Sequence, residues 1–326
     1  MDSAYSPEQI SQYLAHVGLP QSFHPSSSPT LDINYLTTLF VHQITTFPYE
    51  NLSIHYSPDH AIVLDPQALF HKMVTSNRGR GGYCMEVSIL FHHVLRAVGF
   101  SPHMTGVRIR PRINNIPQGQ TYSGFVHLVN IVALRDDQKY ALDVGFGGDG
   151  PTFPMPLIPE VVHRNSIGTQ EVRYARDFIP NQRFQDESLG AMKNWIYQYR
   201  NRPDQDWNSY YAFNDSYEFF EQDFAILSYF LSRSPDQSQT NTVLAIRFLR
   251  GFGDGDGKPK VVGKVMMSNA DVKQNLTGKT NLVKVCRTEE ERVEILRELF
   301  GIQLTEEEAG AIKGCRCELK GDEVLN

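Results

Sequence analysis

The cysteine at position 84 has the surroundings of a reactive thiol. It follows Gly81 and Gly82, which favour a turn, and it precedes apolar residues with the spacing of a helix that buries one face: Val87, Leu90, Phe91, Val94, Leu95 and Val98. Cys84 therefore stands near the first helical turn, where unpaired N–H groups and the helix dipole stabilise a thiolate, the form that attacks. Because free cysteine is also a common core residue, this segment by itself leaves both interpretations open.

A base and an orienting carboxylate are available on a predicted β-hairpin. Residues 125–134 and 139–145 have the composition of two strands joined by a polar turn, with His127 near the start of the first and Asp143 near the end of the second. Side chains alternate between the faces of a strand, so the loop length decides whether these two residues share a face. We expect an odd-length loop or a bulge, which pairs Val129 with Asp143 and brings His127 beside Asp143.

Each of these two residues also has a purely structural explanation. A single histidine in an apolar strand is commonly a hydrogen-bonded core residue, and an aspartate before a glycine-rich stretch commonly ends a strand. The conjunction favours chemistry, because a cysteine nucleophile needs a base within reach and a third group that orients this base. Cys84, His127 and Asp143 form such a set, and chain order does not restrict its geometry.

Bulk properties bound the class of protein. The 326 residues are many for a single core and indicate two or three domains. A net charge of −6 argues against nucleic acid as a partner, and no apolar run is long enough to span a membrane. With no secretory leader in the sequence, we expect a cytoplasmic protein. The other cysteines lack zinc-site spacing and the 251–259 loop lacks the required calcium ligands, so we expect no metal.

Residue patterns also predict the elements around these candidates. A capped helix is predicted at 6–18, and a second helix at 31–40. From about residue 101 the pattern changes to strands and turns, and later segments repeat strand and helix signals: strands at 242–249 and 260–266, and a charged helix at 289–300. Cys315 and Cys317 are expected in a mobile surface tail.

Together these segments resemble the arylamine N-acetyltransferase family over most of the chain. RGGYCME at 80–86 is similar to the family's Arg-Gly-Gly-x-Cys-x-Glu/Gln signature, and FPYENL at 47–52 is similar to its Pro-Phe-Glu-Asn-Leu segment. GFVH at 124–127 and LDVGFG at 142–147 match the segments that carry the family's histidine and aspartate. The motifs at 80–86, 124–127 and 142–147 are highly specific in combination.

The resemblance implies an α+β fold of three domains around a cysteine-protease-like Cys-His-Asp core. A helical domain over 1–100 carries the nucleophile, a β-barrel domain over 101–214 carries the histidine and the aspartate, and an α/β lid domain over 215–326 closes over the site. Insertions near 108–120 and 161–186 depart from compact bacterial members, and the end of the chain departs from mammalian ones. A fungal or other lower-eukaryotic member fits these departures.

The resemblance also implies the activity. An acetyl group moves from acetyl-CoA, the cosubstrate, to the nitrogen of an arylamine or hydrazine through an acyl-cysteine intermediate, with ping-pong kinetics and no tightly bound cofactor. Malonyl-CoA and propionyl-CoA stay open as donors. The partners are these two small molecules, neither nucleic acid nor membrane, and we expect a monomer that acts in xenobiotic metabolism.

Further positions follow from the same resemblance. The expected coenzyme contacts are Ser123, Gly124, Gly145, Gly147 and Phe230. The expected acceptor contacts are Tyr49, Phe125 and Val126. Phe230 stands where mammalian members have a tyrosine, and an ordinary core position is its alternative, as a plain turn is for the glycines. We also expect Arg80 to pair with Glu86 as part of the scaffold.

Two other classes of protein remain compatible with these residues. A cysteine hydrolase or a transglutaminase-like enzyme uses the same Cys-His-Asp chemistry without a need for coenzyme A. A catalytically silent binding protein keeps the fold and forms no acyl-enzyme. Dependence on an amine acceptor separates transfer from hydrolysis, and an acyl adduct on Cys84 excludes the silent protein.

Overall fold

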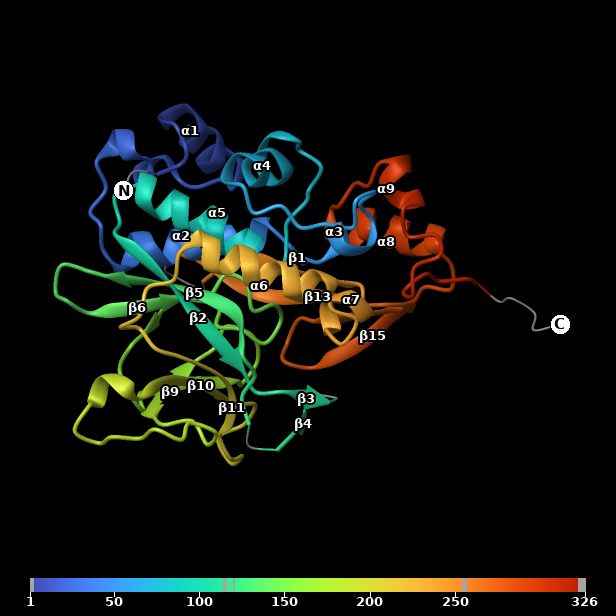
Figure 1. Cartoon of the computed structure of the whole chain (residues 1–326). Coiled ribbons are helices and arrows are strands. Elements are labelled where there is room, and N and C mark those ends of the chain that lie inside the picture. The colour runs from blue at the N-terminus through green and yellow to red at the C-terminus, as the bar shows by residue number, and fades with distance from the viewer. Residues whose placement is uncertain (1–2, 114–115, 120, 254–256, 322–326) are drawn as a thin grey trace.

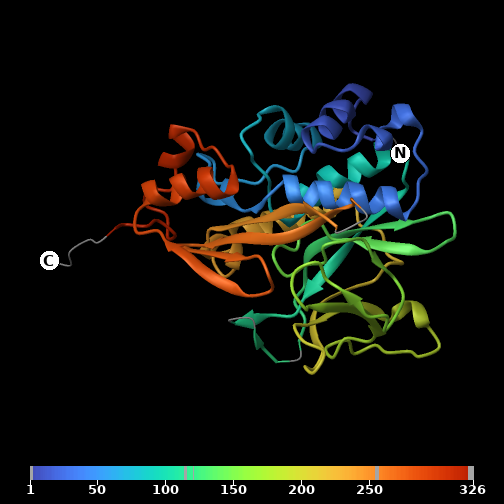
Figure 2. The ribbon, with the colours of Figure 1, turned by 180° about the vertical axis from the view of Figure 1, so that it is seen from behind.

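The computed structural model describes residues 3–113, 116–119, 121–253 and 257–321, and it is an α+β protein in which helices pack against antiparallel sheets (Figure 1). Over those ranges no helix is both long and apolar enough to cross a membrane. The two views agree that the N-terminal helices lie together above a curled sheet, and that the C-terminal helices lie to one side (Figures 1 and 2).

The N-terminal part is built from helices that surround one central helix, α5, which is buried from Cys84 to Leu95. The first helix begins with a capping box: the Ser6 hydroxyl accepts the Gln9 N–H, and the Gln9 side chain accepts the Ser6 N–H. The helices are α1 (Pro7–His16), α2 (Ile33–Thr46), α3 (Leu52–His55), α4 (Pro66–Phe70) and α5 (Cys84–Ala97), with short turns η1 (Gln21–Phe23), η2 (Pro25–Ser27) and η3 (His71–Thr75).

An eight-stranded antiparallel sheet carries the predicted hairpin. Its strand order is β7-β6-β5-β2-β11-β10-β9-β8, and it curls below the helices in Figure 1. The strands are β2 (Pro102–Ile109), β5 (Phe125–Ala133), β6 (Lys139–Leu142), β7 (Met155–Pro156), β8 (His163–Arg164), β9 (Glu171–Asp177), β10 (Asn194–Arg200) and β11 (Asn208–Phe213). A separate small hairpin pairs β3 (Arg112–Ile113) with β4 (Ile116–Pro117), and the turn η4 (Gly190–Met192) precedes β10.

A second sheet joins distant parts of the chain. Its order is β1-β12-β13-β14-β15, and its first strand comes from the helical part. The strands are β1 (Tyr49–Glu50), β12 (Leu244–Phe252), β13 (Pro259–Ser268), β14 (Asp271–Asn275) and β15 (Thr280–Val285). The accompanying helices are α6 (Glu221–Arg233), α7 (Ser238–Asn241), α8 (Glu289–Phe300) and α9 (Glu306–Gly310).

Strand β5 divides two hydrophobic cores. Leu128 and Val132 pack with the helices, whereas Val129 and Ile131 pack inside the curled sheet. Such alternation follows from the two-residue period of a strand. His127 has the same parity as Val129, so its ring belongs to the inner face of the curled sheet.

Most of the predicted elements are confirmed. The helices expected at 6–18, 31–40 and 289–300 correspond to α1, α2 and α8, while the strand expected at 139–145 ends at Leu142. The expectation of a mobile tail at Cys315 and Cys317 is wrong for Cys317, which is buried in the C-terminal core with Leu296 and Phe300. The domain boundaries stay a prediction, and the β1–β12 pairing ties the first predicted domain to the third.

Candidate active site

Cys84 is the first residue of α5 and is almost completely buried, with 5 % of its surface exposed. The helix start is held by Glu86, whose carboxylate accepts the Tyr83 N–H at 3.0 Å. Lys72 in turn holds that carboxylate at 2.8 Å. The sulfur therefore stands at an ordered helix N-terminus, where the backbone dipoles favour negative charge.

The β5–β6 hairpin has the register that the sequence predicts. Asn130 pairs with Leu142 and Ile131 pairs with Ala141, which places position 129 opposite position 143. The loop is closed by the Gln138 carbonyl, which accepts the Leu134 N–H at 3.0 Å, so three residues remain in the turn. Asp137, the last of them, has a positive φ of 59°. The odd-length loop is confirmed.

This register brings His127 and Asp143 into direct contact. The Nε2 atom of His127 lies 3.0 Å from each carboxylate oxygen of Asp143. Both side chains are buried, and the Gly145 N–H donates to Oδ1 of the same carboxylate at 3.2 Å. Asp143 is therefore fixed from both sides, and it fixes the His127 ring, as an orienting carboxylate does for a catalytic histidine.

The electrostatics of His127 follow from these contacts. Burial on its own favours the neutral ring, but the Asp143 charge, the hydrogen bond to Asp143 and a hydrogen bond with Cys84 together raise the pKa of His127 to about 10. Since Nε2 faces Asp143, the other ring nitrogen is the one left to Cys84. The Asp143 carboxylate and the Cys84 side chain thus both act on this ring, and together they favour its charged form.

The glycine after the aspartate brings the loop against the nucleophile helix. A Cβ atom placed on Gly145 would lie 2.8 Å from both the Cα and the carbonyl oxygen of Cys84. No side chain fits there, because neither backbone atom moves without displacing the helix start. Gly145 therefore has a packing role that the sequence reasoning missed. A contact of Gly145 with the coenzyme stays a prediction.

Three residues that contact neighbours of the triad or His127 itself were not identified from the sequence: Ser228, Gln239 and Phe146. The Tyr83 hydroxyl bonds Ser228 of α6, and the Tyr49 hydroxyl accepts a hydrogen bond from Gln239 of α7 at 2.8 Å. The Phe146 ring centroid lies 5.4 Å from that of His127. Burial, above all, raises the pKa of Tyr49 well above its usual range. Ser228 and Gln239 are distant in sequence, so no local signal marked them.

The three predicted acceptor residues are all half-buried, but they lie in different places. Tyr49, in β1, is half-buried beside the loop of Asp143, close to Gly147. Phe125 lies on the other face of β5 from His127, because the pairing with β2 shifts by one residue between them: His127 pairs with Val107, and Phe125 pairs with Arg108. The Arg108 guanidinium lies 3.9 Å from the Phe125 ring centroid, and the Phe219 ring lies 4.9 Å away. It lines a mostly apolar cavity of about 770 Å³ that also contains Gly106. Val126 between Phe125 and His127 is half-buried against the helical core.

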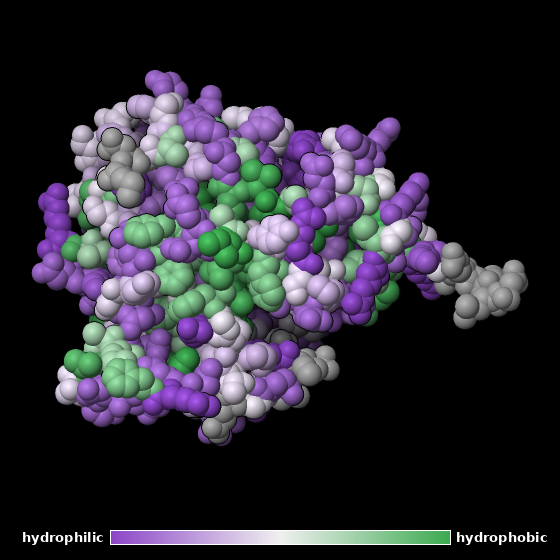
Figure 3. Space-filling view, viewed as in Figure 1, coloured by the Kyte–Doolittle hydropathy of each residue, from purple (hydrophilic) through white to green (hydrophobic). Residues whose placement is uncertain are grey.

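Most of the predicted coenzyme residues lie at or near the surface. Phe230 is 53 % exposed on α6, so the core alternative for it is wrong. Figure 3 shows apolar side chains gathered over this helix, where Ile226 and Tyr229 are also exposed. Gly124 is exposed and has open space around its Cα, whereas the Ser123 hydroxyl bonds the Gly124 carbonyl and the Ile109 N–H.

Arg80 does not pair with Glu86, contrary to the prediction. Its Nε donates to Glu50 at 2.9 Å, and its Nη1 donates to Glu308 at 3.0 Å. The physical reason is that the Glu86 carboxylate turns back toward the Tyr83 N–H and is neutralised by Lys72. The scaffold role of Arg80 thus involves a carboxylate near the C-terminus.

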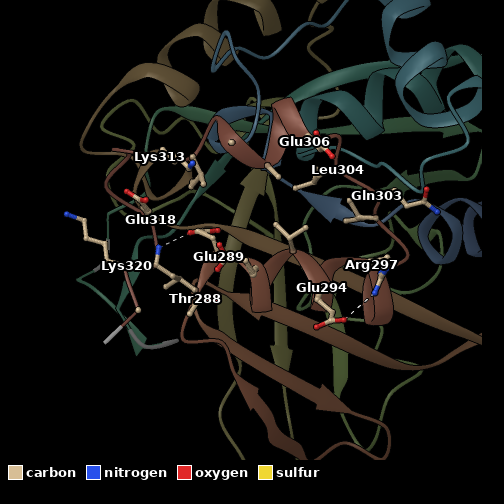
Figure 4. A pocket seen from close by; sticks show the side chains of 18 residues that line it. Thr288, Glu289, Glu294, Arg297, Gln303, Leu304, Glu306, Lys313, Glu318 and Lys320 are labelled. Carbon is tan, nitrogen blue, oxygen red and sulfur yellow. Dashed lines mark hydrogen bonds and ion pairs between the residues drawn. The ribbon is translucent and has the colours of Figure 1, made fainter. Parts of the chain in front are cut away.

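Other parts of the described chain offer less to chemistry. Among the described residues, no group of three or more histidine, cysteine or acidic side chains is placed to hold a metal. A groove of about 1140 Å³ lies at α8, α9 and the segment after them, lined by charged residues of both signs (Figure 4). None of Cys84, His127 and Asp143 lines that groove. The site with a perturbed histidine and a helix-terminal cysteine is the better candidate.

Comparison with known proteins adds independent information. A sequence profile of the N-acetyltransferase family matches residues 32–309. The N-malonyltransferase FDB2 of Fusarium pseudograminearum is 30% identical, covering 94% of this chain and 92% of the relative. Human arylamine N-acetyltransferase 1 is 26% identical, covering 90% of this chain and 94% of the relative.

Solved structures share the fold at low sequence identity. The arylamine N-acetyltransferase of Mycobacterium abscessus superposes with a TM-score of 0.74 at 20% identity, covering 96% of this chain and 97% of that one. The Mycobacterium marinum arylamine N-acetyltransferase in complex with CoA gives a TM-score of 0.71 at 21% identity, covering 95% and 98%. The α+β fold is therefore that of these enzymes.

Proposed function

The chain belongs to the arylamine N-acetyltransferase family, and we propose that it transfers an acyl group from an acyl-CoA to an amine nitrogen through an acyl-Cys84 intermediate. The observation that carries this proposal is the His127 ring, held between the two oxygens of Asp143 and the Cys84 side chain. This is the arrangement of nucleophile, base and orienting group that covalent catalysis by a thiol requires.

In the first half-reaction the Cys84 sulfur attacks the thioester carbonyl. The carbon–sulfur bond to Cys84 forms, the bond to the coenzyme sulfur breaks, and the departing coenzyme thiolate takes the proton that His127 carries. We assign the stabilisation of the negative oxygen of the tetrahedral intermediate to N–H groups at the start of α5. One thioester replaces another, so the step is close to balanced in energy and reversible.

In the second half-reaction the amine attacks the acyl-Cys84 carbonyl. The carbon–nitrogen bond forms, the bond to Cys84 breaks, and the nitrogen loses a proton to His127. The charged ring again faces the sulfur, which restores the starting state. Coenzyme A leaves before the amine reacts, so ping-pong kinetics is the expected signature. Burial of Cys84 and His127 limits the access of water and favours transfer over hydrolysis.

The donor and the acceptor follow from different observations. An acyl-CoA donor is supported by the bacterial relative whose structure holds CoA. We propose acetyl-CoA as the first donor to test and malonyl-CoA as the second, because the 30% identical fungal relative is an N-malonyltransferase. Aromatic side chains beside the triad, Tyr49 and Phe146, suit a flat arylamine or an aromatic hydrazine.

The setting of the reaction is also part of the proposal. A cytoplasmic location keeps Cys84 and the three other cysteines as thiols, which the nucleophile requires. The proposed reaction assembles its triad from one chain, so a monomer suffices. Ser123, Gly124, Gly145, Gly147 and Phe230 remain the proposed contacts for the coenzyme.

Intact-mass measurement tests the intermediate directly. Incubation with acetyl-CoA is expected to add about 42 Da to Cys84, and incubation with malonyl-CoA about 86 Da, as an acyl-enzyme requires. Cys84→Ala should abolish both adducts, while Cys286→Ala, which removes a buried thiol of the C-terminal core, should keep them. An equimolar mixture of the two donors ranks them by the ratio of adducts.

The same samples separate the rival classes. Release of the acyl group only when an arylamine is added supports transfer, whereas rapid loss in buffer alone indicates a hydrolase. An unmodified wild-type protein after exposure to both donors would contradict the proposed function and favour a silent binding protein.

A further inference from the structure

The segment from 301 to 308, after α8, docks on the loop that leads to Cys84. The Gln303 N–H donates to the Arg78 carbonyl at 2.9 Å. Gly79 has a positive φ of 66°, and a Cβ atom on it would lie only 1.9 Å from the Gly301 carbonyl oxygen. The two backbones therefore touch where no side chain separates them. This contact joins residues more than 200 positions apart.

Ion pairs from α9 reinforce this backbone contact. The Glu308 carboxylate accepts Arg80 Nη1 at 3.0 Å and Arg78 Nη2 at 3.1 Å, and a second Arg78 nitrogen also contacts it. Arg80 is almost fully buried, and Glu308 is 17 % exposed. Pairs of this kind in a partly desolvated site are stronger and more directional than exposed ones.

The same arginine continues the chain of charges toward the nucleophile. Arg80 holds Glu50 of β1, and Lys72 lies 3.5 Å from Glu50 and 2.8 Å from Glu86. Glu86 accepts the N–H of the residue before Cys84. Three carboxylates and three cations thus balance around the loop 78–83, and Glu308 is the member that comes from the C-terminal segment.

We propose that Glu308 is a positioning residue for Cys84: through Arg78 and Arg80 it fixes the loop that sets the sulfur against His127. This inference rests on the proposed function of Cys84. Without the Glu308 charge, Arg80 keeps only Glu50 as a carboxylate partner at hydrogen-bond distance among the described residues. The backbone bond between Gln303 and Arg78 stays, but the ion pairs that fix the arginine side chains of the loop are weakened. A displacement of the sulfur by a fraction of an ångström is enough to slow its attack.

Single-turnover kinetics with the full chain tests the proposal. Glu308→Gln is expected to lower the rate constant for acylation of Cys84 at saturating acetyl-CoA by about tenfold, since misplacement acts on attack rather than on binding. The donor concentration that gives half the maximal rate should stay unchanged. Alkylation of Cys84 by iodoacetamide, monitored by mass spectrometry, should also be slower in the same variant.

Two matched controls separate positioning from general stability. Thr305→Ala removes the cap of α9, in which the Thr305 hydroxyl accepts the Glu308 N–H, but keeps the Glu308 carboxylate. Glu307→Gln removes an exposed charge from the same helix. Both should keep the wild-type acylation rate, even where Thr305→Ala lowers the melting temperature as much as Glu308→Gln does.

The milder variant Arg78→Gln covers the case in which Glu308→Gln does not fold. It removes one of the two cations that Glu308 holds, so a smaller loss of acylation rate is expected. In the double variant, the factor by which the acylation rate falls should be smaller than the product of the factors for the two single variants. Wild-type rates of acylation and alkylation in every variant would overturn the positioning role. Failure of wild-type Cys84 to be acylated would instead overturn the proposed function, and the alkylation rates would still decide the role of Glu308.

Discussion

Asp143 offers both of its carboxylate oxygens to one ring nitrogen of His127, at 3.0 Å each, inside the curled sheet. Replacing the carboxylate by an amide in Asp143→Asn keeps the shape and removes the charge that raises the pKa of His127. Burial then favours a neutral ring, and the acylation rate of Cys84 should fall by about 10³-fold or more, as for other orienting carboxylates. Stopped-flow detection of coenzyme A release at neutral pH measures this acylation rate. A loss below fivefold would contradict the orienting role.

Two buried histidines should show opposite charge states at the same pH. Burial would lower the pKa of His127, but the Asp143 carboxylate outweighs it and raises the pKa to about 10. Burial lowers the pKa of His92 to about 4, and the hydrogen bond with the Asn130 side chain does not offset it. Nitrogen-15 NMR between pH 5.5 and 9 should therefore find His127 charged and His92 neutral throughout. The stability that the charged His127 ring provides is complete below its unfolded pKa of about 6.5 and is lost as the pH rises through 10. A midpoint near 7 for His127 would contradict the pairing.

The buried Glu50 carboxylate should contribute to stability in a pH-dependent way. Burial would raise its pKa, but Arg80 and Lys72 lower it to about 2. The contribution is therefore present above the unfolded pKa of about 4.3 and is lost as the pH falls toward 2. Glu50→Gln should lower the free energy of unfolding at pH 7 by about 3–5 kcal/mol, because it leaves buried Arg80 with one carboxylate fewer.

Denaturant titration measures that change. Glu298→Gln, which removes an exposed carboxylate on α8, is the control and should lie within about 0.5 kcal/mol of the wild type. Equal effects of the two substitutions would show that the Glu50 pairs add nothing to stability.

The close approach at Gly145 should make this position intolerant of a methyl group. In Gly145→Ala the new Cβ meets two backbone atoms of Cys84 at 2.8 Å, so the loop or the helix start has to move. We expect a loss of about 1–3 kcal/mol in unfolding free energy and slower acylation of Cys84. Gly190→Ala has open space around its Cβ and should change neither quantity. Unchanged acylation in Gly145→Ala would show that the loop tolerates the shift.

Substitution of Phe230 should weaken the interaction with the acyl-CoA donor and leave the fold unchanged. Because its side chain is 53 % exposed, Phe230→Ala is expected to keep the melting temperature and to raise KM for acetyl-CoA by about fivefold, the effect of losing an aromatic contact. Phe224→Ala on the same helix removes a fully buried ring and should lower stability by about 3–5 kcal/mol. Steady-state kinetics that find KM unchanged in Phe230→Ala would remove this residue from the coenzyme site.

The sequence by itself determined the local part of this protein. Helical spacing after Cys84, the capping signal at Ser6 and the parity of His127 and Asp143 around a short turn are short-range patterns, and the structure has all three. Local patterns are readable because backbone geometry fixes which neighbouring residues share a face.

Only the tertiary structure decided which distant residues support the site. Arg80 pairs with Glu50 and Glu308, Ser228 reaches Tyr83, and Gly145 lies against the nucleophile helix. Local spacing alone predicts that Arg80 pairs with Glu86, six residues away. Long-range partners of this kind depend on how separate elements pack, because charge alone does not decide which of several carboxylates pairs with a given guanidinium. Packing selects among them by distance and burial, which a linear sequence does not record.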